Sequence, residues 1–182
     1  MADRGTKPKK QSAEAKQASP IEALTTVGIG VCAASLDSLL ALFSGLTNGL
    51  LPSYVVGVRQ QDGLTVETVV EALSKSIKLP VKKAQDGENL EPGVVHVGGG
   101  AELITISDGH VVIRPATQAG GNRGTVDTLL ISLAEHARDR AVAVILAGLG
   151  SDGTAGVSAT KQFGGLSIAE SLNGEDDAAE QG

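Results

Sequence analysis

The stretch "VGIGVCAASL", residues 27–36, decides how the rest of the chain is interpreted. Its first half is an apolar strand pattern that ends in a tight turn, and a helical pattern begins at Ser35. Strands and helices that alternate along a chain are typical of parallel α/β sheets, whose sites form where strands end. The chain's only cysteine, Cys32, lies at this turn, where an enzyme could place a nucleophile.

The same alternation continues to the end of the chain, with one interruption. Residues 102–115, "ELITISDGHVVIRP", form two alternating apolar segments around Asp108-Gly109, which predicts an antiparallel hairpin. We therefore expect a three-layer, doubly wound, mainly parallel α/β sheet (Rossmann-like) with an inserted hairpin. Strands are predicted over Thr26–Gly30, Tyr54–Val58, Val94–Val97, Ala141–Ala147 and Leu166–Ala169, and helices over Ser35–Leu46, Val66–Ser76, Thr125–Arg138 and Thr154–Gln162.

Length and charge suggest one domain between two polar ends. The 182 residues carry a net charge of −6, but residues 1–20 hold five basic and two acidic side chains. We expect a disordered basic leader over 1–22, a domain over 23–170 and an acidic tail over 171–182. The single cysteine fits a reducing compartment, and no apolar stretch is long enough to cross a bilayer, so we expect a cytoplasmic protein without membrane insertion. The domain lacks a basic face with aromatic residues, which argues against nucleic acid as a partner.

Three interpretations of the first turn remain open from the residues alone. Gly28 to Ala33 formally match a G-x-G-x-x-A dinucleotide fingerprint, but the acidic residue it needs at the end of the second strand is missing. Cys32 could instead be a nucleophile beside helix-terminal N–H donors, or a small apolar core residue. A second glycine-rich turn, "AGLGSDGTAG" at 147–156, contains Asp152, which an ordinary helix N-cap would also explain.

Taken together, these segments resemble the CheB-type protein-glutamate methylesterase family of bacterial chemotaxis. The resemblance covers about residues 25 to 170 and rests on five segments that follow one another in the chain: "VGIGVCAASLDSL", "LPVKKAQDGENLEPGVVHVGGG", "GGNRGTVDTLLISLAEHA", "VILAGLGSDGTAG" and "GGLSIAE". It implies a doubly wound fold with a Ser-His-Asp triad that hydrolyses methyl esters of glutamate side chains on chemoreceptors. It further implies chemoreceptors or other signalling proteins as partners, a place in a phosphorelay, and neither a cofactor nor a metal.

The family pattern is only partly kept in this chain. Cys32 stands at the position of the nucleophilic serine, and Gln60 stands where the general-base histidine is expected. Asp152 matches the orienting carboxylate, and Gly30, Ala33 and Leu149 fall at the oxyanion or turn positions. The family's Gly-Gly is replaced by Ala34-Ser35, whereas its Arg-x-x-x-Asp pair survives as Arg123 and Asp127. The preceding receiver domain and the last strand-and-helix segment of the family have no counterpart in the sequence as given.

Gln60 is the most consequential of these replacements, because a carboxamide neither takes up a proton at neutral pH nor returns one to methanol. The three histidines offer no substitute, since His96 is predicted inside a strand, His110 at the hairpin and His136 late on a helix. We therefore expect a catalytically impaired methylesterase-like domain, a pseudoenzyme. The alternatives are an active thiol-based ester hydrolase that uses Cys32, a nucleotide-binding Rossmann-like module, and a fragment that depends on a partner.

Overall fold

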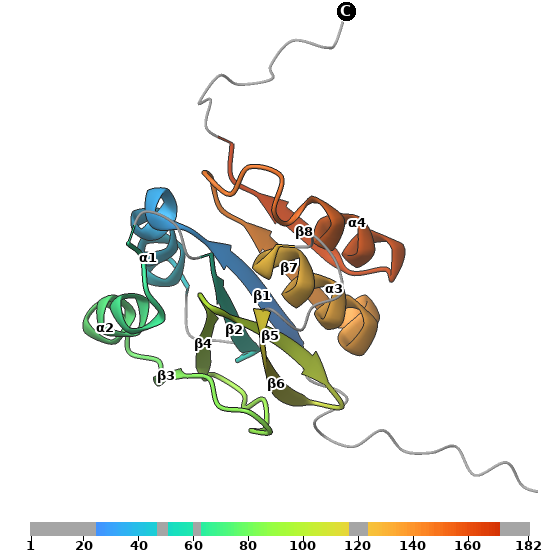
Figure 1. The fold of residues 1–182 in the computed structure, drawn as a ribbon, viewed down its shortest axis with the longest axis horizontal. Helices are drawn as coiled ribbons and strands as arrows, with labels where there is room; N and C mark the ends of the chain where they lie inside the picture. Colours follow the sequence, from blue (N-terminus) through green and yellow to red (C-terminus); the bar gives the residue numbers. More distant parts are fainter. Residues whose placement is uncertain (1–24, 47–50, 60–62, 117–123, 172–182) are drawn as a thin grey trace, which may run out of the picture.

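The computed structural model describes residues 25–46, 51–59, 63–116 and 124–171. Six strands in this part of the chain form one parallel sheet, in the spatial order β3-β4-β2-β1-β7-β8 (Figure 1). The chain adds strands on one side of β1 first and then returns to the other side, so the winding direction reverses between β1 and β7. The strands are β1 Thr26–Val31, β2 Ser53–Val58, β3 Val81–Lys83, β4 Val95–Gly99, β7 Ala141–Ile145 and β8 Leu166–Ala169.

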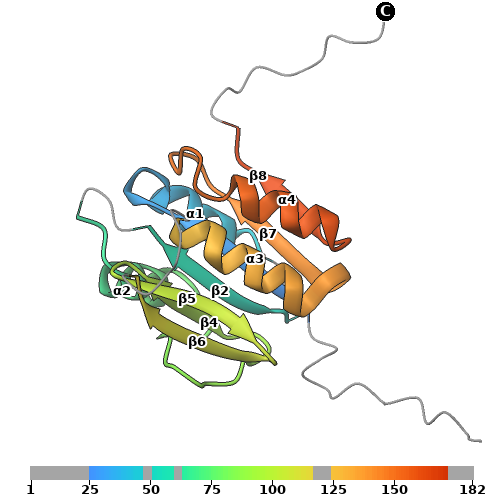
Figure 2. The ribbon, with the colours of Figure 1, turned by 45° about the vertical axis from the view of Figure 1, so that its right-hand side comes forward.

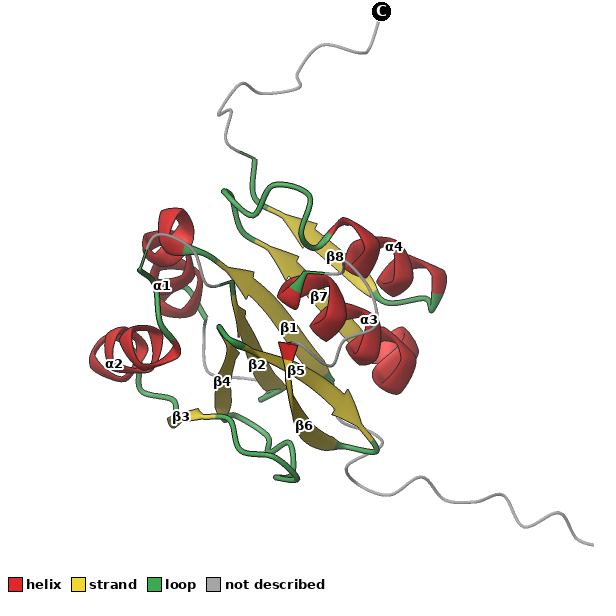
Figure 3. Ribbon diagram, viewed as in Figure 1, coloured by secondary structure: helices red, strands yellow, loops and turns green. Residues whose placement is uncertain are grey.

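Helices cover both faces of this sheet (Figures 2 and 3). Helices α1 (Leu36–Ser44) and α2 (Val66–Ser76) pack on one face and share an apolar core with alternate residues of the central strands. Helix α3 (Thr125–Ala137) forms the core of the opposite face, where helix α4 (Thr154–Gln162) lies beside it. The three-layer, doubly wound arrangement expected from the sequence is thereby confirmed.

The hairpin is also confirmed, and it packs against α3. Strand β5 (Glu102–Ser107) pairs antiparallel with strand β6 (His110–Pro115) in a separate two-stranded sheet. Asp108 and Gly109 both have positive φ, +51° and +79°, the backbone form that a two-residue hairpin turn requires. The amide of Ile106 donates to Ser132 Oγ of α3 at 3.0 Å, which joins the hairpin to that helix.

Two glycines of β1 let α3 approach the sheet closely. A Cβ at Gly28 would lie 2.7 Å from Leu133 Cδ2, and one at Gly30 would lie 2.5 Å from Val126 Cγ1. Any larger residue would push α3 away from β1, because real Cβ atoms do not come this close to other heavy atoms. Gly28 and Gly30 therefore serve helix-on-sheet packing.

The structure departs from the predicted elements in a few places. A short 3₁₀ helix, η1 (Ala33–Ser35), precedes α1, and a second one, η3 (Arg138–Arg140), follows α3. Strand β7 ends at Ile145, two residues earlier than predicted, because the chain enters a turn at Ala147. Strand β3 was not predicted at all. It has three residues, is only partly buried, and lacks the apolar run by which longer strands are recognised.

Candidate functional site

The two glycine-rich turns meet at the carboxyl ends of neighbouring strands. Strands β1 and β7 pair directly, at the place where the winding direction reverses, which is where open α/β sheets form their sites. A Cβ at Gly148 would lie 2.9 Å from Ala34 Cβ and 3.0 Å from Cys32 Sγ. Gly148 also has a φ of +85°, so both its backbone form and the space around it favour glycine. The structure thus brings the Cys32 turn against the second turn.

Cys32 is buried, with 2% of its surface exposed. Its thiol donates to the carbonyl oxygen of Ala147 at 3.6 Å and lies 3.5 Å from Ser35 Oγ. The Cys32 amide donates to the same Ser35 Oγ at 3.1 Å, so the side chain of Ser35 closes the turn on itself. Within the part of the chain that the structure describes, the recorded partners of Sγ are therefore a carbonyl and a hydroxyl, and neither is a base that could activate a thiol.

Ala147 joins the Cys32 turn to the end of β8. Its carbonyl oxygen accepts from the Cys32 thiol, and its amide donates to Glu170 Oε2 at 2.8 Å. Glu170 Oε1 in turn accepts from Ser38 Oγ of α1 at 2.6 Å. The hydrogen bond from the Ala147 amide, followed by that from Ser38, holds the pKa of Glu170 below its usual range.

Asp152 caps a helix, but not the helix that follows it. Its Oδ1 accepts from the Asp127 amide at 2.9 Å and its Oδ2 from the Val126 amide at 3.4 Å, in the first turn of α3. The N-cap residue of α3 is Gly124, which has no side chain, and a Cβ there would overlap the Asp152 carboxyl group. The sequence interpretation of Asp152 as the cap of its own helix is therefore wrong, because the carboxylate reaches across to a neighbouring helix.

Asp127 does the same for α4. Its Oδ1 accepts from the amides of Gly153 and Gly156, both at 2.9 Å. The N-cap of α4 is Gly153, with a φ of +112°, which again supplies no side chain. Helices α3 and α4 pack side by side, and a carboxylate at the start of each one caps the other. The exchange also places a negative charge at the positive end of each helix dipole.

The general-base position, Gln60, lies outside the described residues, as do Arg123, the leader and most of the tail. Its neighbour Arg59 is described. The Arg59 amide donates to the Val31 carbonyl at 2.8 Å, and its guanidinium donates to the Leu149 carbonyl. Arg59 therefore connects the end of β2 to both turns. Sequence reasoning missed this role, because an arginine after a buried strand gives no sign of the distant carbonyl that it binds.

The predicted oxyanion or turn positions occupy different environments. Gly30 lies inside β1 against α3, Ala33 is the first residue of η1 and half-buried, and Leu149 is 1% exposed. A Cβ at Gly30 would lie 2.9 Å from Leu149 Cδ1, so Leu149 packs over the strand. Gly28 and Gly30 also lie within the strand rather than in a turn that could hold a pyrophosphate, which does not favour the dinucleotide interpretation.

The histidines lie where the sequence placed them. His96 is inside β4, His110 begins β6 with Nδ1 2.8 Å from the Asp108 carbonyl, and His136 is near the end of α3. None of them is a recorded partner of the Cys32 sulfur. A replacement base for Cys32 is therefore not found among the described histidines.

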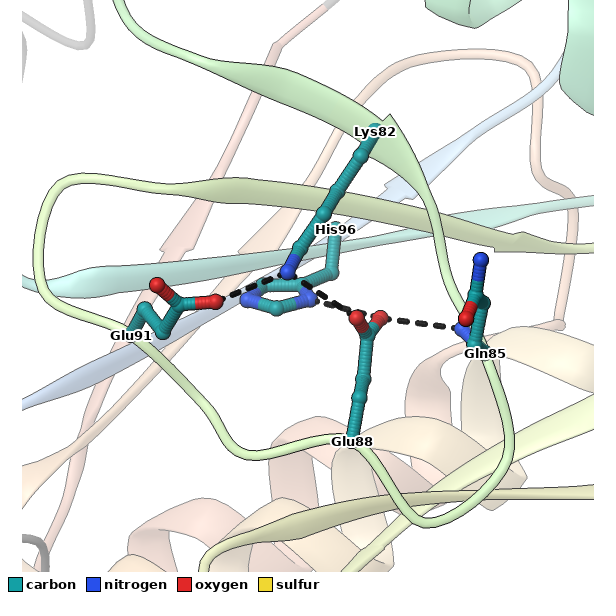
Figure 4. A network of polar contacts seen from close by, with 5 residues as sticks. All are labelled: Lys82, Gln85, Glu88, Glu91 and His96. Carbon is teal, nitrogen blue, oxygen red and sulfur yellow. Dashed lines mark hydrogen bonds and ion pairs between the residues drawn. The ribbon is translucent and has the colours of Figure 1, made fainter.

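His96 belongs instead to a polar network that sequence reasoning missed (Figure 4). The ring is fully buried, and Nδ1 lies 2.9 Å from Glu88 Oε1, which also accepts from the Gln85 amide at 2.9 Å. Lys82 of β3 bridges Glu88 Oε2 at 3.0 Å and Glu91 Oε1 at 2.8 Å. Burial alone would raise the pKa of Glu88, but the hydrogen bonds from His96, the Gln85 amide and Lys82 hold it below its usual range.

A pocket of about 370 Å³ lies between the start of α2 and the end of β4. It is lined by the first turn of α2, by residues 98–102 at the end of β4 and the start of β5, and by Lys83, whose Nζ lies 2.7 Å from Glu67 Oε1. The Gly100 amide donates to the Val58 carbonyl at 2.7 Å, so this pocket lies next to the end of β2. In the described part of the chain, no group of three or more His, Cys, Asp or Glu residues could hold a metal ion, and no described helix is long and apolar enough to span a bilayer.

Comparison with known proteins identifies similar folds and sequences. A family model described as CheB methylesterase matches residues 27–175. The protein-glutamate methylesterase/protein-glutamine glutaminase 2 of Shewanella oneidensis is 31% identical over 148 residues, which cover 79% of this chain and 42% of that protein. The corresponding protein of Salmonella typhimurium is 32% identical over 123 residues, or 65% of this chain and 35% of that protein.

The crystal structure of the Thermotoga maritima CheB methylesterase catalytic domain has the same fold. It superposes with a TM-score of 0.71 at 29% identity, covering 83% of this chain and 82% of that one. The chain thus spans less than half the length of the curated relatives described here.

Proposed function

The chain belongs to the CheB methylesterase family, and from this membership we propose that it is a methylesterase-like signalling domain whose own catalysis is impaired. Its partners are methylated chemoreceptors or other signalling proteins, and its place is the cytoplasm. Support for the partner class comes from the relatives, which are protein-glutamate methylesterases. Support for the impairment comes from the residues of this chain.

The observation that carries the proposal is how fully the candidate triad residues are engaged in structural contacts. Both oxygens of Asp152 accept amides of α3, and the buried thiol of Cys32 donates to a backbone carbonyl. The sequence places an amide at position 60, where the family pattern has its base. Asp152 and Cys32 thus each have a role that does not require catalysis, and position 60 lacks the group that catalysis would need.

Ester hydrolysis through a covalent intermediate needs more than these groups supply. The nucleophile must lose its proton as it attacks the ester carbonyl, and methanol must gain a proton as the C–O bond breaks. Water must then be deprotonated to release the carboxylate. Gln60 can do none of these proton transfers, and the loss of one triad member lowers kcat by about four powers of ten or more.

The direct test is hydrolysis of a methylated receptor and of a simple methyl ester by the full chain and by Cys32→Ala. We expect both proteins to match the rate of the buffer alone, with the Thermotoga maritima catalytic domain as the positive control. Turnover by the full chain that disappears in Cys32→Ala would show an active enzyme and contradict the proposal.

The rival function, a thiol-based ester hydrolase, is separated by the reactivity of Cys32. A working thiolate must be accessible, whereas this sulfur belongs to a residue that is 2% exposed and donates to a carbonyl. We expect a thiol-directed electrophile to label the folded chain slowly and the urea-unfolded chain fully. Rapid stoichiometric labelling of the folded chain at neutral pH would favour the rival.

A further inference from the structure

Cys32 lies directly beneath the surface of the molecule, although its side chain is buried. Its sulfur is next to Gly148, because a Cβ at Gly148 would lie 3.0 Å from Sγ and 2.9 Å from Ala34 Cβ. Gly148 and Ala34 are both exposed, whereas Cys32 itself is 2% exposed. On this side, the main chain at Gly148 therefore separates the thiol from solvent.

The turn that passes over the thiol is joined to the rest of the domain through side chains. Residues 147–150 follow β7 and belong to no helix or strand. Within the described residues, three recorded hydrogen bonds join this turn to other elements: from Cys32 Sγ to the Ala147 carbonyl, from Arg59 to the Leu149 carbonyl, and from the Ala147 amide to Glu170 Oε2. Segments that lack ladder hydrogen bonds open locally at a lower free energy than core strands do.

The two halves of this turn differ in how firmly they are fixed. Leu149 is 1% exposed and packs over Gly30 of β1, so it anchors the second half in the core. In the first half, Ala147 is half-buried and Gly148 is exposed. Gly148 also has a φ of +85°, and glycine leaves the main chain the widest choice of conformations. We expect local motion at residues 147 and 148, with Leu149 staying in place.

Glu170 holds the first half of the turn. Its Oε2 accepts from the Ala147 amide at 2.8 Å, and its Oε1 accepts from Ser38 Oγ of α1 at 2.6 Å. Its own amide donates to the Ile145 carbonyl at 2.9 Å, which fixes the main chain of Glu170 beside the end of β7. Hydrogen bonds to an ionised acceptor are about twice as strong as neutral ones, and a thiol is a weak donor. The carboxylate is therefore the stronger of the two contacts at Ala147.

We propose that residues 147 and 148 form a strap over the Cys32 thiol and that Glu170 is the latch that keeps this strap closed. The thiol is then a protected group, which a reagent reaches by local opening of the strap rather than by unfolding of the domain. This inference does not depend on the loss of ester hydrolysis, because opening is measured without turnover.

The test is the rate at which an aromatic disulfide reagent labels the folded chain at urea concentrations below the unfolding transition. Cys32 is the only cysteine, so the signal has a single source. We expect slow labelling of the parent chain at a rate that changes little with urea, because local opening exposes little new surface. Glu170→Ala should be labelled about tenfold faster, since the strap loses its charged acceptor.

Two further variants separate the latch from a general loss of charge. Glu135→Ala is the matched control, because Glu135 is exposed on α3 and is not among the recorded hydrogen-bond partners of the strap; it should be labelled like the parent chain. Ser38→Ala frees one carboxylate oxygen of Glu170 and should speed labelling by a smaller factor than Glu170→Ala. Circular dichroism and urea unfolding verify that each variant is folded.

Amide hydrogen exchange locates the opening. In Glu170→Ala the Ala147 amide should exchange faster, while the Val144 amide inside β7 should be unchanged. Three results would each overturn the proposal: equal labelling of Glu170→Ala and Glu135→Ala, labelling of the parent chain that rises with urea in step with global unfolding, or an Ala147 amide whose exchange is the same in Glu170→Ala as in the parent chain.

Discussion

Asp127 and Asp152 cap each other's helices. Asp152 accepts amides of the first turn of α3, in which Asp127 lies, and Asp127 accepts amides of the first turn of α4, which begins two residues after Asp152. Each helix starts at a glycine that cannot cap it. The exchange gives Asp152 a structural role that persists without an imidazole to orient.

Removing the Asp152 carboxylate should therefore lower stability rather than activity. We expect Asp152→Ala to reduce the free energy of unfolding in urea by about 1 kcal/mol, the usual effect of losing an N-cap. Asp152→Asn keeps one carbonyl oxygen as acceptor and should lose less. If both variants unfold like the parent chain, the capping role is not energetically significant.

Gly124 should be coupled to Asp152. A Cβ at Gly124 would overlap the Asp152 carboxyl group, so Gly124→Ala displaces the cap. We expect Gly124→Ala to destabilise the parent chain by about 1 to 2 kcal/mol, and clearly less in the Asp152→Ala background, where the overlap is gone. A double-mutant cycle of urea unfolding measures this coupling. Additive losses would mean that the two residues act separately.

The Glu88–His96 contact should make stability depend on acid pH. The pKa of Glu88 is below its usual value of 4.5 in the folded chain, so the carboxylate contributes stability above about pH 4.5 that is lost as pH falls through the folded-state pKa. We expect Glu88→Gln to cost about 1.5 to 3 kcal/mol at pH 7, the scale of a hydrogen bond to a charged group, and progressively less below pH 4.5.

Urea unfolding of the parent chain and of Glu88→Gln between about pH 3 and pH 7 measures the difference in their free energies of unfolding. This difference should approach zero at the acid end of the range. Glu91→Gln serves as control, because Glu91 binds only the Lys82 end of the network and is far more exposed. A penalty for Glu88→Gln that stays constant with pH would contradict the assignment.

Restoring an imidazole tests whether Gln60 limits catalysis. If the missing base is the main defect, Gln60→His should raise methyl-ester hydrolysis by about a hundredfold over the parent rate, the scale of a general base. The gain should vanish when Cys32→Ala is added. Gln61→His is a matched control one residue further on, and an equal gain in that variant would point to a nonspecific effect of histidine.

Local patterns were sufficient to predict most of the fold. Helices α2 and α4 and strand β8 have the predicted bounds, because apolar spacing and flanking turn residues act within a few positions. Strand β3 escaped prediction because it is three residues long and two of them are lysines, which pair with carboxylates outside the strand. Its pairing with β4 is a tertiary contact that no local pattern encodes.

The site was harder to predict than the fold, because most of its contacts are tertiary and join residues far apart in the sequence. The Cys32 turn and the 147–156 turn were each predicted as strand-end turns, but their meeting depends on the pairing of β1 with β7, which was not predicted from the sequence. Three contacts join distant positions: the exchanged caps of Asp127 and Asp152, the bond from Arg59 to the Leu149 carbonyl, and the contact of Glu88 with the buried His96. Such contacts depend on how the helices and strands are placed relative to one another. The local patterns of a single sequence do not contain this information.

Ala147 gives the molecule one further property. Its carbonyl holds the sulfur of Cys32 and its amide holds Glu170 at the end of the edge strand, so a single residue is shared by the buried thiol and the sheet margin. A displacement of the Ala147 peptide would alter both hydrogen bonds at once. The burial of Cys32 and the position of Glu170 thus depend on the same peptide unit.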